Sequence, residues 1–108
     1  MRKEIGKIQR ISVGLGGYQD AQIGVSVTLG GEGWGVGDFR GAWAIERSDY
    51  CKWTEQDRRN ELADTMMWLL GLLQDAKKST VDELNNVPVE VTFDGNILKS
   101  WRILTEVI

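Results

Sequence analysis

The sequence predicts an α+β fold in which one antiparallel sheet of about five strands packs against one long helix. Three stretches before residue 46 alternate apolar with small or polar residues, the pattern of half-buried strands. After Thr54 the apolar period becomes helical, and alternation then returns on both sides of the hairpin turn Asp94-Gly95-Asn96. The predicted order is β-β-β-α-β-β in a single domain over residues 1–108, and the short connections favour antiparallel neighbours.

The first three strands are expected over residues 5–13, 23–29 and 39–45. The second is the clearest, because apolar and mostly β-branched residues occupy every second position. In the first, Ile8 falls out of phase with Ile5 and Val13, so we expect Ile8 on the face turned away from the core. In the third, Trp43 shares the phase of Phe39 and is expected in the core.

The long helix is expected to begin after Thr54, whose hydroxyl suits the N-cap, with Asp57 at the third helical position. Apolar residues then recur at helical spacing from Leu62 to Leu73, which predicts one helix of about six turns. Lys77 and the lysine after it suit the other end, because cations oppose the negative pole of the helix dipole.

The C-terminal third is expected to hold a short helical turn at 79–84 and two strands at 87–93 and 97–108. Pro88 donates no hydrogen bond, so we expect it at a strand start or on an edge. Trp101 lies on the inward phase of the last strand and is expected in the core. The apolar residues left on other phases are candidates for a second apolar patch, so the second face of the sheet is expected to be wet, covered by loops or buried in a homodimer. These residues are Ile8, Leu98 and Leu104.

Composition excludes several classes of mechanism. The 108 residues carry a formal net charge of −3, no histidine and one cysteine, Cys51. The commonest general base and zinc ligand is therefore missing, and no intrachain disulfide can form, so we expect no metal, no cofactor and a cytoplasmic setting. No stretch has the pattern of a signal peptide or a membrane span. The acidic balance disfavours a general nucleic-acid surface but leaves room for a local basic patch.

Glycine occupies every second position from Gly31 to Gly37, which in extended backbone leaves one face bare. The stretch is not a P-loop, because no Lys-Ser or Lys-Thr follows and the next element has the pattern of a strand. The dinucleotide fingerprint GxGxxG fails as well, since Arg40 stands where the third glycine is required. These glycines are expected to serve a turn, a close backbone approach or a ligand surface.

Two candidate surfaces follow from residues that the periodicity does not place in the core. Trp34 lies among the glycines, and its indole is expected either to stack on a ligand or to cover one end of the sheet. The candidate binding surface consists of Tyr18, Gln19, Asp20, Trp34, Asp38 and Arg40. Trp68 and Leu72 flank the main apolar row of the helix and form a candidate dimer or partner surface, unless loops cover a wide apolar face there.

Four stretches resemble a family of small, uncharacterised bacteriophage and prophage proteins. They are residues 16–21 (GGYQDA), 29–38 (LGGEGWGVGD), 89–95 (VEVTFDG) and 98–108 (LKSWRILTEVI), about a third of the chain. The resemblance implies a phage or prophage origin and a cytoplasmic setting in a bacterium. It implies no catalytic residue. By analogy with other small acidic phage proteins, it favours a protein that acts by binding a host or phage component.

Three hypotheses for function remain. The first is a non-enzymatic phage or prophage accessory protein that binds a host or phage protein, in counter-defence or replication. The second is a single-stranded nucleic-acid-binding module that uses Trp34, Tyr18 and Arg40. The third is a small-molecule-binding or hydrolytic pocket built from carboxylates in or near loops. These carboxylates belong to Asp20, Glu32, Asp38, Glu46 and Asp49.

Overall fold

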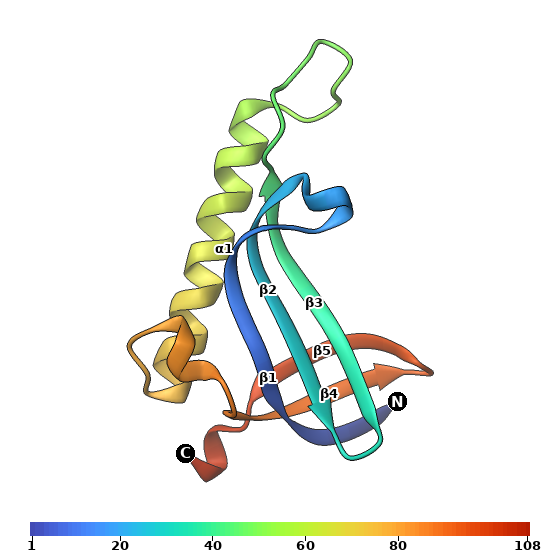
Figure 1. Ribbon diagram of the computed structural model, residues 1–108, viewed down its shortest axis with the longest axis vertical. Helices are drawn as coiled ribbons and strands as arrows, with labels where there is room; N and C mark the ends of the chain where they lie inside the picture. Colours follow the sequence, from blue (N-terminus) through green and yellow to red (C-terminus); the bar gives the residue numbers. More distant parts are fainter.

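The computed structural model describes residues 1–108 and has the predicted element order, with five strands in one antiparallel sheet and one long helix (Figure 1). The strands are β1 (Arg2–Gly16), β2 (Gln22–Gly31), β3 (Trp34–Trp43), β4 (Pro88–Asp94) and β5 (Ile97–Ile103). The long helix is α1 (Glu55–Ala76), and three short 3-10 helices are η1 (Tyr18–Asp20), η2 (Val81–Leu84) and η3 (Thr105–Val107). The α+β prediction is confirmed. None of the helices combines the length and the apolarity needed to cross a bilayer.

The strand order in the sheet is β3-β2-β1-β4-β5. The sheet has two halves, β3-β2-β1 and β1-β4-β5, and β1 belongs to both. Its residues from Arg2 to Lys7 pair with β4, and those from Lys7 to Gly16 pair with β2. Figure 1 shows the β4–β5 hairpin running across one end of the β1–β2–β3 layer, with β1 curving from one half into the other. Sheet halves that cross in this way can enclose a core between their facing sides.

A register shift in β1 lies between Ile8 and Arg10, where one extra residue enters the ladder with β2. Because the extra residue resets the alternation, Ile8 and Ile11 both face the core, at 0% and 4% exposure. Ile5 and Val13 are more than half exposed. The expectation that Ile8 faces away from the core and contributes to an outer apolar patch is therefore wrong. Leu98 does not form such a patch either, since it packs against the core.

The inward phase of β3 is set by Trp34 and Val36, which pack against the core. Counting by two along the strand places Asp38 and Arg40 on the same side of the sheet. Trp43 falls on the opposite face and is only half-buried, so its expected place in the core is wrong. The alternation near the end of β3 could not show which of its faces packs on the core, because the glycines earlier in the strand carry no side chains that would mark that face.

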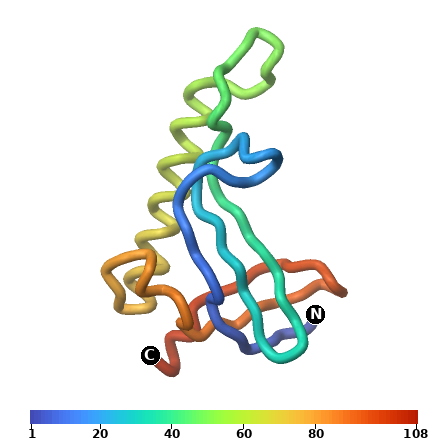
Figure 2. Tube along the Cα trace, in the orientation of Figure 1, coloured from blue at the N-terminus to red at the C-terminus, as the bar shows by residue number.

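Helix α1 follows the predicted span and covers one face of the sheet, with Thr65, Leu69, Leu72 and Ala76 buried. Thr54 is its N-cap, as predicted, and completes a capping box with the third helical residue. Figure 2 shows the helix running beside the β1–β2–β3 layer, while the loop between β3 and α1 stands clear of the sheet. The last strand is shorter than predicted, because β5 ends at Ile103 and the chain turns into η3.

Candidate functional site

Trp34 is the first residue of β3 rather than a loop residue, and its indole packs inward. Its ring meets the Phe93 ring edge to face, with centroids 5.5 Å apart and planes at 85°. A Cβ atom on Gly31 would lie 2.6 Å from the indole Nε1, and one on Gly6 would lie 2.6 Å from Cζ2. These two glycines therefore make room for the indole. Of the roles expected for the alternating glycines, close approach to a neighbouring group applies to Gly31.

The structure separates the members of the first candidate surface. Tyr18, Gln19 and Asp20 form η1 at one end of β2, and Trp34 follows the turn at the other end. The ten residues of β2 between them span about 30 Å. The expected grouping of Trp34 with Tyr18 is therefore not assembled, and the two aromatic rings of the nucleic-acid hypothesis lie at opposite ends of the sheet. Tyr18 itself is 71% exposed.

Asp38 and Arg40 instead meet two tryptophans from other elements. The Trp101 Nε1 donates a hydrogen bond of 2.9 Å to Asp38 Oδ2, and Arg40 Nε lies 3.9 Å from the same oxygen. The Arg40 guanidinium stands 4.5 Å from the centre of the Trp68 ring, as in a cation–π contact. The rings of Trp68 and Trp101 meet edge to face, with centroids 5.8 Å apart and planes at 89°. We call Asp38, Arg40, Trp68 and Trp101 the tryptophan–arginine cluster.

Strand geometry explains how β3 and β5 present their side chains at this place. Asp38 and Arg40 are two apart on one strand, so both side chains leave the same face. Trp101 pairs with Val91 of β4 and therefore shares the core side of its half of the sheet. The coiling of the sheet then brings the two edge strands, β3 and β5, within hydrogen-bond distance of each other.

The cluster is open to solvent on one side. The side chain of Arg40 is 50% exposed and that of Asp38 is 24% exposed, while both tryptophans are half-buried. Leu72, the other member of the second candidate surface, is 7% exposed and belongs to the core. The structure thus joins Trp68 with two members of the first surface. The sequence predicts Trp101 in the core, and its only signal for this contact is the Nε1 group, which needs a polar partner.

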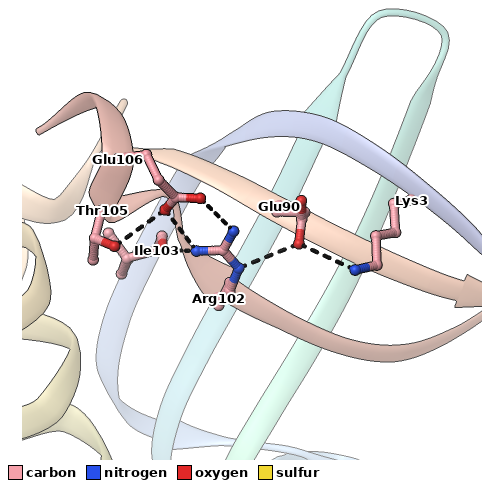
Figure 3. A network of polar contacts seen from close by, with 6 residues as sticks. All are labelled: Lys3, Glu90, Arg102, Ile103, Thr105 and Glu106. Carbon is pink, nitrogen blue, oxygen red and sulfur yellow. Dashed lines mark hydrogen bonds and ion pairs between the residues drawn. The ribbon is translucent and has the colours of Figure 1, made fainter.

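A second polar network lies where β4, β5 and η3 meet (Figure 3). Arg102 Nε lies 3.2 Å from Glu90 Oε1, and Lys3 Nζ lies 3.8 Å from the same oxygen. The Arg102 guanidinium also donates two hydrogen bonds to Glu106, of 2.8 and 2.7 Å. These bonds lower the pKa of Glu106 to about 2 and raise the pKa of Arg102 above its usual range. Each charge has a partner of opposite sign, and Arg102 links Glu106 of η3 to Glu90 of the sheet.

The remaining reactive side chains are dispersed. Cys51 lies in the loop before α1, where hydrogen bonds from the backbone and hydroxyl of Ser48 lower the pKa of its thiol. Asp20 and Glu32 lie at opposite ends of β2. Asp38 is engaged by Trp101 and Arg40, and no group of three or more metal-ligating side chains occurs. The carboxylates considered for a hydrolytic pocket therefore do not gather around Trp34.

The outer face of the sheet, away from α1, is bare where the glycines alternate. Gly35 and Gly37 lie on this face, and a Cβ atom on either would meet its nearest neighbour only at 3.7 or 3.8 Å. A polar groove of about 360 Å³ opens near η1, between β1 and β2, and Arg10 and Asp20 help to line it. The bare stretch and the groove leave this side of the sheet open to solvent.

A comparison of the chain with protein-family models, curated proteins and solved structures found no match. The structure itself defines the class as an α+β domain with one five-stranded antiparallel sheet and one long helix. Among the candidate surfaces of this chain, the tryptophan–arginine cluster is the most completely assembled.

Proposed function

We propose that this chain is a non-enzymatic accessory protein, of phage or prophage origin and cytoplasmic in its bacterial host, that binds a host or phage protein. The proposed contact surface is the tryptophan–arginine cluster. The observation that carries the proposal is the position of Arg40, whose side chain is half exposed and holds its guanidinium over Trp68 and beside Asp38. The origin and the setting follow from the family resemblance of the sequence.

Three physical arguments support a role in protein recognition. Tryptophan and arginine are the residue types most enriched among the side chains that dominate binding energy at interfaces. A guanidinium already held by two neighbours loses less conformational freedom on binding than a free one. The face of Arg40 that is not engaged by Asp38 can still donate hydrogen bonds to a carboxylate or to backbone carbonyls. We therefore expect a partner that presents an acceptor-rich patch beside an apolar one.

The test is affinity purification from an infected or lysogenic host, with the captured proteins identified by mass spectrometry. Wild type, Arg40→Ala and Arg59→Ala are compared at equal bait concentration. Arg59 is an exposed arginine of α1 outside the cluster, so its variant controls for lost charge. We expect Arg40→Ala to lower capture of the specific partner about tenfold or more, and Arg59→Ala to leave it unchanged.

Thermal melts of both variants accompany the purification, because a variant that unfolds would also lose its partner. Equal capture by wild type and a folded Arg40→Ala variant would reject the cluster as the contact surface. Turnover of a substrate by the purified wild-type protein would reject the non-enzymatic assignment itself.

A further inference from the structure

The second half of β1 is a free sheet edge in the middle of the strand order. β4 pairs with β1 only as far as Lys7, and the two residues before β4 make the last bonds on this side of β1, with Ile8. The Ile8 amide donates to the Val87 carbonyl at 3.0 Å, and the Asn86 amide donates to the Ile8 carbonyl at 2.7 Å. Beyond this point β1 continues to Gly16 with β2 on one side and no strand on the other.

The register shows which residues face this open side. Ile8 directs its N–H and C=O groups towards Val87 and Asn86, just before β4, and so away from β2. The one-residue shift after Ile8, together with the alternation of an antiparallel ladder, then directs the corresponding groups of three later residues to the open side. These residues are Ile11, Val13 and Leu15. Their intervening neighbours direct their backbone groups to β2.

The same three residues carry apolar side chains on the helix side of the sheet, and α1 leaves two of them uncovered. Val13 is 55% exposed and Leu15 is 66% exposed. No charged residue and no proline occurs from Ile11 to Gly16. The other edges carry charges, with Lys99 and Arg102 on β5 and a charged pair on β3. Charged residues commonly protect exposed edges from pairing, and this one lacks them.

We propose that a second copy of this chain pairs with the free edge of β1, antiparallel and about a two-fold axis at Val13. Val13 then lies opposite the partner's Val13, and Ile11 lies opposite the partner's Leu15. By symmetry, Leu15 lies opposite the partner's Ile11. Each of these three pairs exchanges two backbone hydrogen bonds. The two sheets become one continuous sheet, and the exposed apolar side chains of both copies lie side by side on the helix side.

Self-complementarity favours a second copy over an unrelated strand. From Ile11 to Leu15 the side chains run apolar, small, apolar, small, apolar, so the pattern is the same in both directions. The only charged residue close to this register, Arg10, falls opposite the partner's Gly16, so no like charges meet across the axis. A two-fold axis requires this kind of self-matching surface.

The dimer is independent of the proposed function, because its surface and the tryptophan–arginine cluster use different strands. The cluster lies on β3, β5 and α1, whereas the dimer uses β1. Loss of dimerisation would therefore leave partner capture by a single copy in place, and loss of capture in Arg40→Ala would leave the dimer in place.

Backbone amide exchange of the wild-type protein tests the edge directly, at low and at high protein concentration. We expect the amides of Ile11, Val13 and Leu15 to become protected as concentration rises, because their donors gain partners only in the dimer. The amides of Ser12 and Gly14, which face β2, serve as internal controls with protection independent of concentration. A dimer in which the three outward amides remain unprotected would overturn the proposed edge.

Sedimentation equilibrium of two matched variants gives the second test. Val13→Lys places two like charges across the axis, and we expect it to weaken dimerisation about 100-fold or more. Ile5→Lys changes a residue of the same strand with similar exposure, 58%, in the part that β4 already pairs, and should leave the dimer unchanged. A wild-type protein that sediments as a monomer at every concentration would overturn the proposal, as would equal effects of the two variants.

Discussion

At the scale of single residues, the alternating glycines serve at least two roles. Gly31 is required, because a Cβ atom there would lie 2.6 Å from Trp34 Nε1 and 2.8 Å from the Ile5 carbonyl oxygen. Gly33 adopts a φ of 78° in the turn between β2 and β3, where glycine carries no penalty. A Cβ atom on Gly35 or Gly37 would make only ordinary van der Waals contact, at 3.7 or 3.8 Å from a backbone oxygen. The sequence could not separate these roles, because it shows the spacing of the glycines but not the neighbours of each.

The two kinds of glycine predict opposite effects of the same substitution. Gly31→Ala should destabilise the fold by about 1–3 kcal/mol, because the methyl group overlaps a backbone oxygen and a packed indole. Gly35→Ala should leave stability unchanged or raise it by about 0.5 kcal/mol, since alanine loses less backbone entropy on folding. Urea denaturation of both variants measures the difference, and equal losses would contradict the assignment of Gly35 to an open face.

At the scale of elements, α1 is the part that the sequence predicted best. Its span, its length of about six turns and its N-cap follow from local pattern, and local pattern decides them in the structure as well. Its C-terminal end departs from the preferred chemistry. Lys77 is the C-cap and adopts the left-handed conformation, with φ 56° and ψ 44°, where glycine is usual.

Lys77→Gly should therefore raise the free energy of unfolding by about 1 kcal/mol, because glycine adopts this conformation without the steric cost of a Cβ atom. Lys78→Gly is the matched control, since Lys78 is not among the residues with positive φ. Thermal melts should show a higher midpoint for the first variant and no gain for the second. A lower midpoint for Lys77→Gly would show that its side chain contributes more than its conformation costs.

The turn η3 depends on pH through Glu106. Its pKa is lowered to about 2 in the folded chain by hydrogen bonds from Arg102, against an ordinary value of 4.5. The ionised form is thus favoured by folding, so the stabilisation is fully present above pH 4.5 and is lost as pH falls towards 2. The effect is small, because the carboxylate is exposed to solvent.

An acid titration of wild type and Glu106→Gln tests this contact. The stability advantage of wild type should shrink between pH 4.5 and about 2, because protonation removes a negative charge that the amide of the variant never carries. The carboxyl resonance of Glu106 followed by NMR should show a midpoint near 2. A midpoint near the ordinary value would mean that the ion pair with Arg102 is not maintained in solution.

The bulge in β1 shows what local pattern could not predict. Ile5, Ile8, Ile11 and Val13 are all compatible with a strand, but their faces depend on where an extra residue enters the ladder. The position of that residue depends on β2 and on the crossing of β4, which lie far along the chain. The strand was therefore predicted correctly, and the side of the sheet on which Ile8 lies was not.

At the scale of the whole molecule, the element order and the pairing direction were predictable, and the closure of the sheet was not. Asp38 and Trp101 are 63 residues apart and lie on the two outermost strands of the strand order. Only the coiling of the sheet brings them together, and no periodicity records it. For the same reason, the sequence placed Asp38 and Arg40 on one candidate surface but did not indicate that Trp68 and Trp101 meet them there.

The bond between these edge strands predicts a stability effect. Trp101→Phe keeps an aromatic ring but removes the Nε1 donor to Asp38, so we expect a loss of about 1–2 kcal/mol in the free energy of unfolding. Asp38→Ala in the same background should then cost little more, because the bond to Trp101 is already lost and the remaining ion pair with Arg40, at 3.9 Å and partly exposed, contributes little. Urea denaturation of the single and double variants measures the coupling, and strictly additive losses would contradict it.

The division of β1 between two halves of the sheet has a consequence for synthesis on the ribosome. Arg2 to Lys7 are translated before β2, β3 and α1, yet the segment that pairs with them, Pro88 to Phe93, is translated after these elements. During most of translation this stretch is an unpaired strand on a nascent polypeptide, able to associate with any other exposed strand. The first half of β1 is therefore made long before its partner strand, and the sheet can close only after β4 and β5 have left the ribosome.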